Sequence, residues 1–250
     1  MNKIFVFDLD GTLAKSKSSI DEQMTMLLID ILWRHKVCVI SGGKWGQFQE
    51  QLIKPLRPLC AHLDRLHLFP TCGTSYYKAA EPKGGKAIFK KIYQHDLHDV
   101  EVIKVMDAFK ATFRETGYIE FNTVGKIIEN RGSQVTFSAL GQEAPLKLKK
   151  AWDPDRKRRK AMLAVLQPLL PEFDVRLGGT TSVDVTRKGM DKGFGISMIE
   201  KHLSCDRSEL IFFGDALEPG GNDHAVYKAG VLCVPVDDPL DCIWKVKLHL

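Results

Sequence analysis

An apolar run near the start of the chain ends abruptly in two acidic residues. Residues 4–7 (IFVF) are bulky and favour β structure, which is typical of a strand buried within a parallel sheet. Asp8 and Asp10 follow at once, and Gly11 and Thr12 come soon after. A buried parallel strand indicates an open α/β sheet. Ligands of such sheets bind beyond the carboxyl ends of the strands, which is where these two acids lie.

Strand-like and helix-like segments alternate at both ends of the chain. The predicted elements are, in chain order, a strand at 3–7, a helix at 20–34, a strand at 37–41, a helix starting near Trp45, a helix at 190–203, a strand at 209–215, a helix at 222–230 and a strand at 231–236. This alternation predicts an α/β fold, with a doubly wound, Rossmann-like parallel sheet.

The middle of the chain has a different order. It reads as helix, two strands, helix, two strands, which is an α+β pattern. The predicted elements are helices at 86–94 and 100–116, strands at 125–129 and 134–138, a helix from Asp153 to about Leu170, and a strand pair in DVRLG and TSVDVT. We therefore expect a core made of residues 1–82 and 187–250, and an inserted αββαββ cap domain at 83–186.

The composition argues against several classes of protein. The chain has 250 residues, 27% charged and 44% hydrophobic, and a net charge of +5. It is long enough for one large domain or two modest ones. No apolar run approaches ~18 residues, no signal-peptide pattern is present, and no two cysteines form a C-x-x-C pair. We expect a soluble, cytoplasmic protein with reduced cysteines.

One basic run, KLKKAWDPDRKRRK at 147–160, is a candidate nucleic-acid patch. Its only aromatic residue is Trp152, whereas nucleic-acid binding favours interleaved aromatic side chains or a matching basic face. We expect a solvated helix face here and no nucleic-acid partner. Steering of an anionic substrate is the alternative.

Three predicted strands end in polar residues that would meet at one edge of the sheet. These residues, together with one lysine at a helix start, are Asp8 and Asp10, Ser41 and Gly42, Lys192, and Asp215 with Asp223 close behind. A carboxylate can accept a phosphoryl group as an aspartyl phosphate. Crowded carboxylates need a hard cation such as Mg²⁺, and a lysine and a hydroxyl can stabilise the transferring oxygens. The sequence therefore predicts a Mg²⁺-dependent phosphoryl-transfer site.

Four segments resemble the motifs of the haloacid dehalogenase superfamily of phosphotransferases. They are FDLDGTL, VISGG, DKG and FFGDALEPGGND. The inserted αββαββ segment resembles the cap of the subfamily that holds sugar phosphatases and eukaryotic-type phosphomannomutases. The closer likeness is to the mutases, because GGNDH, the EQL after SGG, the FP…YK stretch at 69–78 and the hairpin IENRGSQVTFSALGQ are all similar to theirs.

The resemblance implies a role for each matching residue. Asp8 would be the nucleophile and Asp10 the acid and base, with Thr12, Ser41 and Lys192 completing the catalytic set. Mg²⁺ would be held by Asp8, the Asp10 carbonyl and Asp215, with Asp223 close by. The expected substrate-binding residues are Gly42, Lys17, Arg131, Gln142, Lys149, Ser182 and Asp184.

Two cap positions depart from the mutase pattern. Gln142 and Lys149 stand where that family has phosphate-binding arginines, and Lys17 replaces another basic residue. Glutamine cannot bind phosphate as the guanidinium fork does, and losing such a donor costs about 1.5–3 kcal/mol. We therefore expect a phosphatase that acts on a small phosphorylated metabolite, such as a sugar phosphate. Phosphomannomutase activity is the alternative, and a catalytically silent binding protein is a remote one. We expect no membrane partner and a possible homodimer through the cap.

Overall fold

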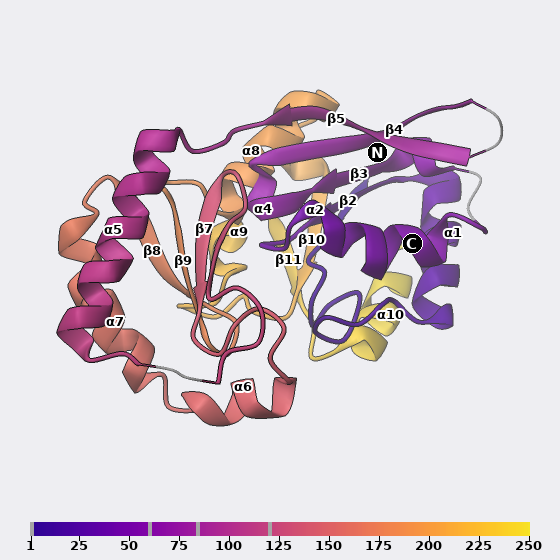
Figure 1. The fold of residues 1–250 in the computed structure, drawn as a ribbon. Coiled ribbons are helices and arrows are strands. Elements are labelled where there is room, and N and C mark those ends of the chain that lie inside the picture. The colour runs from indigo at the N-terminus through magenta and orange to yellow at the C-terminus, as the bar shows by residue number, and fades with distance from the viewer. Residues whose placement is uncertain (1–2, 60–61, 84–85, 120–121) are drawn as a thin grey trace. The chain divides into compact units, whose positions relative to one another are not determined.

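The computed structural model describes residues 3–59, 62–83, 86–119 and 122–250. The chain divides into two compact units (Figure 1). The first consists of Met1–Gln94 and Met190–Leu250, and the second is His95–Gly189, so the second is inserted into the sequence of the first. Across the described ranges, no helix combines the length and the apolar character needed to cross a lipid bilayer.

The first unit is built on a seven-stranded sheet. Its strands are, in spatial order, β11 (Leu232–Pro235), β10 (Leu210–Gly214), β1 (Ile4–Phe7), β2 (Lys36–Ile40), β3 (Leu66–Phe69), β4 (Ser75–Lys83) and β5 (Lys86–Gln94). The strands from β11 to β3 run parallel, and β4 and β5 are antiparallel to their neighbours. The predicted α/β fold is confirmed, and the parallel strands bring their carboxyl ends to one edge.

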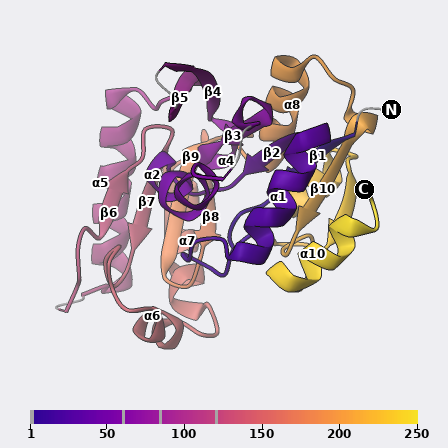
Figure 2. The ribbon, with the colours of Figure 1, turned by 90° about the vertical axis from the view of Figure 1, so that its right-hand side faces the viewer.

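Helices cover both faces of this sheet (Figure 2). The helical segments are α1 (Glu22–Arg34), α2 (Trp45–Phe48), a π-helical segment (Gln49–Ile53), α3 (Lys54–Leu56), a 3-10 turn (Leu63–Arg65), α4 (Pro70–Gly73), α8 (Lys192–Leu203), a 3-10 turn (Arg207–Glu209), α9 (His224–Lys228) and α10 (Pro239–Lys247). Alternate residues of β1 serve the two faces. Phe5 and Phe7 pack in the cluster that contains α1 and α10 residues, and Ile4 and Val6 pack with α8.

The prediction of a helix at 86–94 was wrong. These residues form β5, which pairs with β4 and belongs to the first unit. Ile88, Phe89, Ile92 and Tyr93 are spaced as on one helix face, but the same residues also suit a strand. Ile88 and Ile92 are exposed while Phe89 and Tyr93 are half-buried. Their β-branched and aromatic side chains favour strand pairing once a long partner such as β4 is available.

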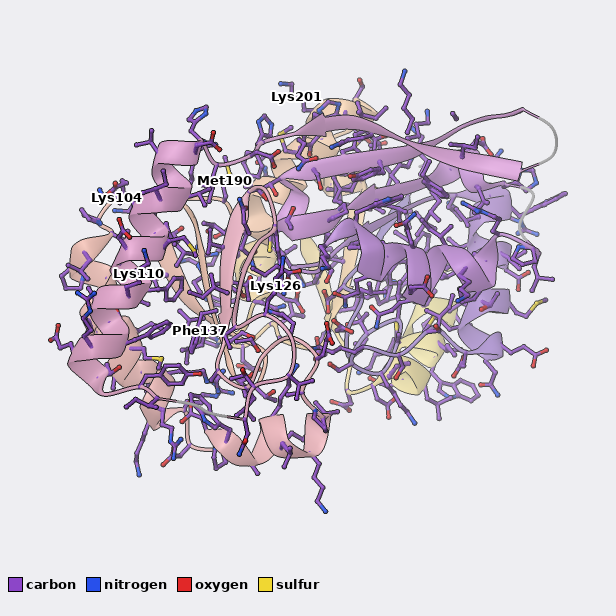
Figure 3. The ribbon with its side chains drawn as sticks, in the orientation of Figure 1. Lys104, Lys110, Lys126, Phe137, Met190 and Lys201 are labelled. Atoms are coloured by element: carbon purple, nitrogen blue, oxygen red, sulfur yellow. The ribbon has the colours of Figure 1, made fainter. Side chains whose placement is uncertain are left out.

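The second unit is a four-stranded antiparallel sheet with helices. Its elements are α5 (Asp99–Thr116), β6 (Ile128–Asn130), β7 (Gln134–Ser138), α6 (Leu146–Trp152), α7 (Lys157–Leu169), β8 (Phe173–Gly178) and β9 (Ser182–Arg187), and its strands lie in the order β6-β7-β9-β8. Its core surrounds Phe137 on β7 (Figure 3), whose ring lies 5.8 Å from that of Phe109 on α5. The predicted α+β pattern is confirmed, as is the helix predicted at 100–116, which is α5.

The helix predicted to begin at Asp153 begins later. Asp153 follows α6, and α7 starts at Lys157 after Arg156, whose φ is +61°. The Asp153 carboxylate nevertheless accepts hydrogen bonds from the main-chain N–H groups of Arg158 and Arg159, at 3.0 and 3.2 Å. It also pairs with the buried Arg159 guanidinium at 2.8 Å. Asp153 thus satisfies main-chain N–H groups in the first turn of α7 from a position before the helix.

Candidate active site

The end of β1 places Asp8 inside the first unit. Asp8 follows Phe7 directly, and its N–H donates to the carbonyl of Phe213 on β10 at 3.0 Å, so the strand ladder continues through it. The Asp8 side chain is buried. Gly11 then turns the chain with a φ of +92°, and a Cβ on it would lie 2.3 Å from Oδ2 of Asp215. Only glycine fits here, because both the backbone angle and the space exclude a side chain.

Lys192 reaches the same place from the first turn of α8. Asp191 caps this helix by accepting from the N–H groups of Gly193 and Phe194 at 2.9 and 3.2 Å. The Lys192 side chain is fully buried, and its Nζ donates to Asp8 Oδ1 at 2.5 Å and also to Asp223 Oδ1. One cation therefore bridges two buried carboxylates.

Three carboxylates gather around this lysine. Asp8, Asp215 and Asp223 each offer an oxygen atom, and these oxygens lie within 4.8 Å of one another. Asp223 is held in place because its Oδ2 accepts the N–H of Ala216 at 3.1 Å. Gly214 leaves the necessary room, since a Cβ there would lie 2.5 Å from Asp223 Oδ2. The sequence placed these three acids at one sheet edge, and the structure brings them together.

The electrostatics of the cluster call for a cation. Burial raises the pKa of Asp8 to about 7, with Asp223 adding to the rise and Lys192 acting against it. Burial also raises the pKa of Asp215, helped by the charge of Asp223. For Lys192 burial alone would lower the pKa, but Asp223 and Asp8 outweigh it and raise the value. Three acids sharing one lysine leave net negative charge in a confined space.

A divalent magnesium ion suits this donor set. All three ligands are carboxylate oxygens, which Mg²⁺ prefers, and the missing side chain of Gly11 lets the Asp215 carboxylate approach the backbone there. The carboxylate of Asp10 lies outside the cluster, so its expected part in metal binding, through its main-chain carbonyl, stays a prediction.

The Asp10 carboxylate is held by donors from two other segments. Its Oδ1 accepts the N–H of Lys17 at 2.7 Å and Nε2 of Gln51 at 3.3 Å, and its Oδ2 accepts Nε2 of Gln47 at 2.6 Å. Lys17 adopts a φ of +60° at this contact. Gln47 and Gln51 were not among the residues predicted for the site. Their spacing of four residues, on one face of the helix after Gly43, was the available signal.

Ser41 and Thr12 occupy buried positions near the same edge. Ser41 follows β2, which pairs with β1 so that Val39 lies opposite Phe7, and its Oγ accepts the N–H of Gly43 at 3.2 Å. Thr12 is fully buried, and its Oγ1 has no hydrogen-bond partner among the residues that the structure describes. Such an orphan hydroxyl is compatible with a ligand contact. The catalytic roles of Ser41, Gly42 and Thr12 stay predictions.

The second unit holds the other expected substrate residues, and it brings Arg131 next to Gln142. Arg131 pairs with Glu129 through Nε at 2.8 Å, and its Nη2 donates to Gln142 Oε1 at 3.3 Å. Lys149 is buried and donates from Nζ to the main-chain carbonyl of Gln142 at 2.8 Å. The amide nitrogen of Gln142 is buried without a partner in the described ranges. Gln142 thus lies between two cationic side chains.

Asp184 and Ser182 lie on β9, beside β7. Thr136 donates from Oγ1 to Asp184 Oδ1 at 2.7 Å, and the two residues are register partners. Burial raises the pKa of Asp184, while the charge of Arg131 lowers it. Ser182 is half-buried at the start of the strand, opposite Ser138. The five expected residues of this unit therefore fall on β9, on α6, and on the segments that precede and follow β7.

Comparison with known proteins agrees with this arrangement. Residues 24–249 match the model of the eukaryotic phosphomannomutase family. A probable phosphomannomutase of Caenorhabditis elegans is 26% identical over 231 residues, covering 90% of this chain and 85% of that protein. The phosphomannomutase of Encephalitozoon cuniculi is 25% identical over 249 residues, covering 97% and 91%.

Solved structures share the fold. An IMP-bound IMP-nucleotidase of Plasmodium falciparum superposes with a TM-score of 0.69 at 12% identity, covering 99% of this chain and 68% of that one. A haloacid dehalogenase-like hydrolase of Bacteroides thetaiotaomicron gives 0.64 at 17% identity, covering 98% and 92%. These likenesses establish a haloacid dehalogenase fold, and the family match covers most of the sequence. The chain belongs to the eukaryotic phosphomannomutase family.

Proposed function

We propose that this protein is a phosphomannomutase that interconverts mannose 6-phosphate and mannose 1-phosphate. The family match over residues 24–249 carries the proposal. Its first unit has the groups for phosphoryl transfer, and its second unit has a cationic cluster around Gln142. An isomerisation through a sugar bisphosphate needs both a transfer site and a second phosphate-binding site.

The transfer step uses Asp8 as nucleophile. A carboxylate oxygen of Asp8 attacks phosphorus, the bond to the sugar oxygen breaks, and the phosphoryl group stays on Asp8. Asp10 donates the proton to that leaving oxygen. It takes a proton back when the free hydroxyl of a bound sugar monophosphate attacks the phosphoaspartate and forms the sugar bisphosphate, whose other phosphoryl group then returns to Asp8. Lys192 keeps Asp8 oriented and offsets charge on the phosphoryl oxygens.

The carboxylates Asp8, Asp215 and Asp223 would hold Mg²⁺. When bound, the ion neutralises charge on the transferring phosphoryl group. Gln47 and Gln51 hold the carboxylate of Asp10 in one orientation.

Hydrolysis is the second candidate function, and one observation favours it. Gln142 replaces an arginine of the mutase pattern. This loss of a phosphate-binding side chain was the basis for predicting a phosphatase from the sequence. The family comparison supports the isomerase instead. The neighbouring Arg131 and Lys149 also supply two cations beside Gln142, which lessens the effect of the replacement.

One assay distinguishes the two functions. The purified protein is given mannose 1-phosphate, Mg²⁺ and a catalytic amount of a hexose 1,6-bisphosphate, and mannose 6-phosphate and free phosphate are measured separately. Isomerisation faster than phosphate release supports the mutase. Phosphate release as the faster reaction makes the protein a phosphatase. The Asp8→Asn variant serves as the control for contaminating enzymes.

A further inference from the structure

The first unit contains a polar cavity at the amino ends of its parallel strands β1 and β2. It has a volume of about 520 Å³ and is lined by the beginnings of β1 and β2, by β3 and β4, and by the end of α8. Ile4 lines it, whereas Asp8 follows the other end of the same strand. The cavity is therefore separate from the candidate active site and independent of the function proposed above.

Positive charge dominates the lining. The cavity has five cationic side chains, namely Lys3, Arg34, Lys36, Arg65 and Lys78, against the two carboxylates Asp64 and Glu209. Two cations already have main-chain partners, since Lys3 donates to the carbonyl of His249 at 3.3 Å and Arg65 donates to that of Leu32 at 3.3 Å. These carbonyl contacts leave the net charge unchanged.

Lys36 and Lys78 approach the cavity from one face of the sheet. Cys38 and His67 are register partners across β2 and β3, and His67 and Lys78 are partners across β3 and β4. Lys36 precedes Cys38 by two residues and therefore points to the same face. Neither lysine forms an ion pair within the described ranges, and both are exposed.

The pKa of His67 is sensitive to the positive charges of Lys36 and Lys78. The ring is buried, and its Nδ1 lies 2.8 Å from the hydroxyl of Tyr76, which also lines the cavity. Burial, together with the charges of Lys78 and Lys36, lowers the pKa of His67 to about 3. The imidazole is thus neutral, and it leaves the two ammonium groups as uncompensated cations.

A structural role for the lysines is poorly supported. Glu209 accepts the main-chain N–H of Asp206 at 2.8 Å and thereby caps a 3-10 turn. Lys36 and Lys78 also line the cavity beside the C-terminal end of α8. In the part of the chain that the structure describes, neither donates a hydrogen bond to the last carbonyls of that helix, which are the partners expected of helix-capping lysines. Their charges remain available to a ligand.

We propose that this cavity is an anion-binding site for a small molecule that carries two or more phosphate charges, held by Lys36 and Lys78. Ammonium groups bind phosphate as point charges, and two of them on one side of a recess suit a compact polyanion better than a neutral metabolite. The volume is sufficient for a diphosphate group with an organic substituent.

Inorganic pyrophosphate is the probe that tests the site. The metal-free full-length protein is titrated at low salt, and binding is followed by calorimetry and by the ring NMR signals of His67 and His202, both of which line the cavity. We expect saturable shifts of both rings. We expect the Lys36→Met/Lys78→Met variant to bind at least ten-fold more weakly, and each single variant at least three-fold more weakly.

The matched control removes two lysines elsewhere in the same unit. Lys201 on α8 (Figure 3) and Lys228 on α9 are exposed and do not line the cavity. The Lys201→Met/Lys228→Met variant should bind within two-fold of the wild type. Wild-type affinity in the Lys36→Met/Lys78→Met variant, an equal loss in the control, or binding without movement of the two ring signals would each overturn the proposal. The single variants decide the matter if the double variant does not fold.

Discussion

Lys192 Nζ lies 2.5 Å from Oδ1 of Asp8, and both side chains are almost completely buried. The same ammonium group pairs with Asp223, which is also buried. A single cation therefore supports two carboxylates at the end of the parallel sheet. Removing the cation from such a buried set leaves its two carboxylates without compensation. The nucleophile and a large part of the local stability depend on one contact.

Lys192→Met should damage both stability and turnover. We expect the free energy of unfolding to fall by about 3–5 kcal/mol, and turnover to fall by about 10²–10³-fold because charge stabilisation at the phosphoryl group is lost. Urea denaturation in chelator gives the first quantity. The Lys192→Met/Asp223→Asn variant should recover part of the stability. A loss below about 1 kcal/mol, as for an exposed pair, would contradict the buried ion pair.

Asp8→Asn should abolish turnover and keep the fold. The amide has nearly the shape of the carboxylate but cannot form a phosphoenzyme, so we expect a loss of at least about 10³-fold. Stability in chelator should be unchanged or higher, because one of three crowded charges is gone. Asp30→Asn, at an exposed position on α1, is the control and should retain full activity. Substantial turnover by Asp8→Asn would mean that another group is the nucleophile.

Mg²⁺ should stabilise the protein more at pH 8 than at pH 5. The pKa of Asp8 in the metal-free folded protein is raised from 3.8 to about 7, so the folded state retains a proton there that the unfolded chain has lost. This group's contribution to stability is therefore fully present below about pH 4 and is lost as the pH rises through 7. The bound ion opposes that loss, because it favours the ionised carboxylate.

Thermal unfolding with Mg²⁺ and with chelator, measured from pH 5 to pH 8, checks this dependence. The difference in Tm should grow with pH and level off above about 7. A difference that is constant across the range, or that shrinks as the pH rises, would show that the three carboxylates do not bind the ion.

Gln47→Ala should lower kcat while leaving KM within about two-fold. The variant removes the 2.6 Å hydrogen bond to Asp10 Oδ2, and a bond to a charged group is worth about 1.5–3 kcal/mol, or roughly 10–100-fold in rate if it is needed only in the transition state. Gln49→Ala, an exposed neighbour, is the control. An increase in KM with an unchanged kcat would assign Gln47 to substrate binding instead.

The sheet and its acidic edge could be predicted because their signals are local. A short apolar strand followed by acids, as at Asp8 and Asp215, specifies both burial and the position of the carboxylates. Lys192 was predictable in the same way, because it follows the N-cap Asp191. By contrast, β5 depends on pairing with β4, and no residue within 86–94 distinguishes that strand from a helix.

Residues that act through distant contacts could not be predicted in the same way. Gln47 and Gln51 matter because they reach Asp10, more than thirty positions away, and their four-residue spacing indicates a shared helix face but not which residue that face contacts. Lys36 and Lys78 are ordinary surface lysines in the sequence, and only the register across β3 brings them to one cavity. Tertiary pairing, which residue spacing does not encode, determines these parts of the molecule.

Gln142→Arg tests how the second unit binds phosphate. Gln142 lies between Arg131 and Lys149, which donate to its side-chain and main-chain oxygens. A guanidinium at this position would add a bidentate donor, so a hexose 1,6-bisphosphate should bind more tightly by about 1–2 kcal/mol. Monophosphates should gain little. Gln167→Arg, an exposed change on α7 with the same added charge, is the control.

The ratio of isomerisation to phosphate release tells whether the wild-type cluster is already sufficient. If Arg131 and Lys149 hold the second phosphate by themselves, Gln142→Arg should tighten bisphosphate binding without changing that ratio by more than about two-fold, since the added contact serves both orientations of the sugar equally. If the wild-type protein mainly releases phosphate and the variant mainly isomerises, the glutamine itself makes the protein a phosphatase. Isomerised sugar and free phosphate are therefore measured for the wild type and for Gln142→Arg, each primed with the same hexose 1,6-bisphosphate. A change from mainly phosphate release in the wild type to mainly isomerisation in the variant occurs only if the glutamine itself makes the protein a phosphatase.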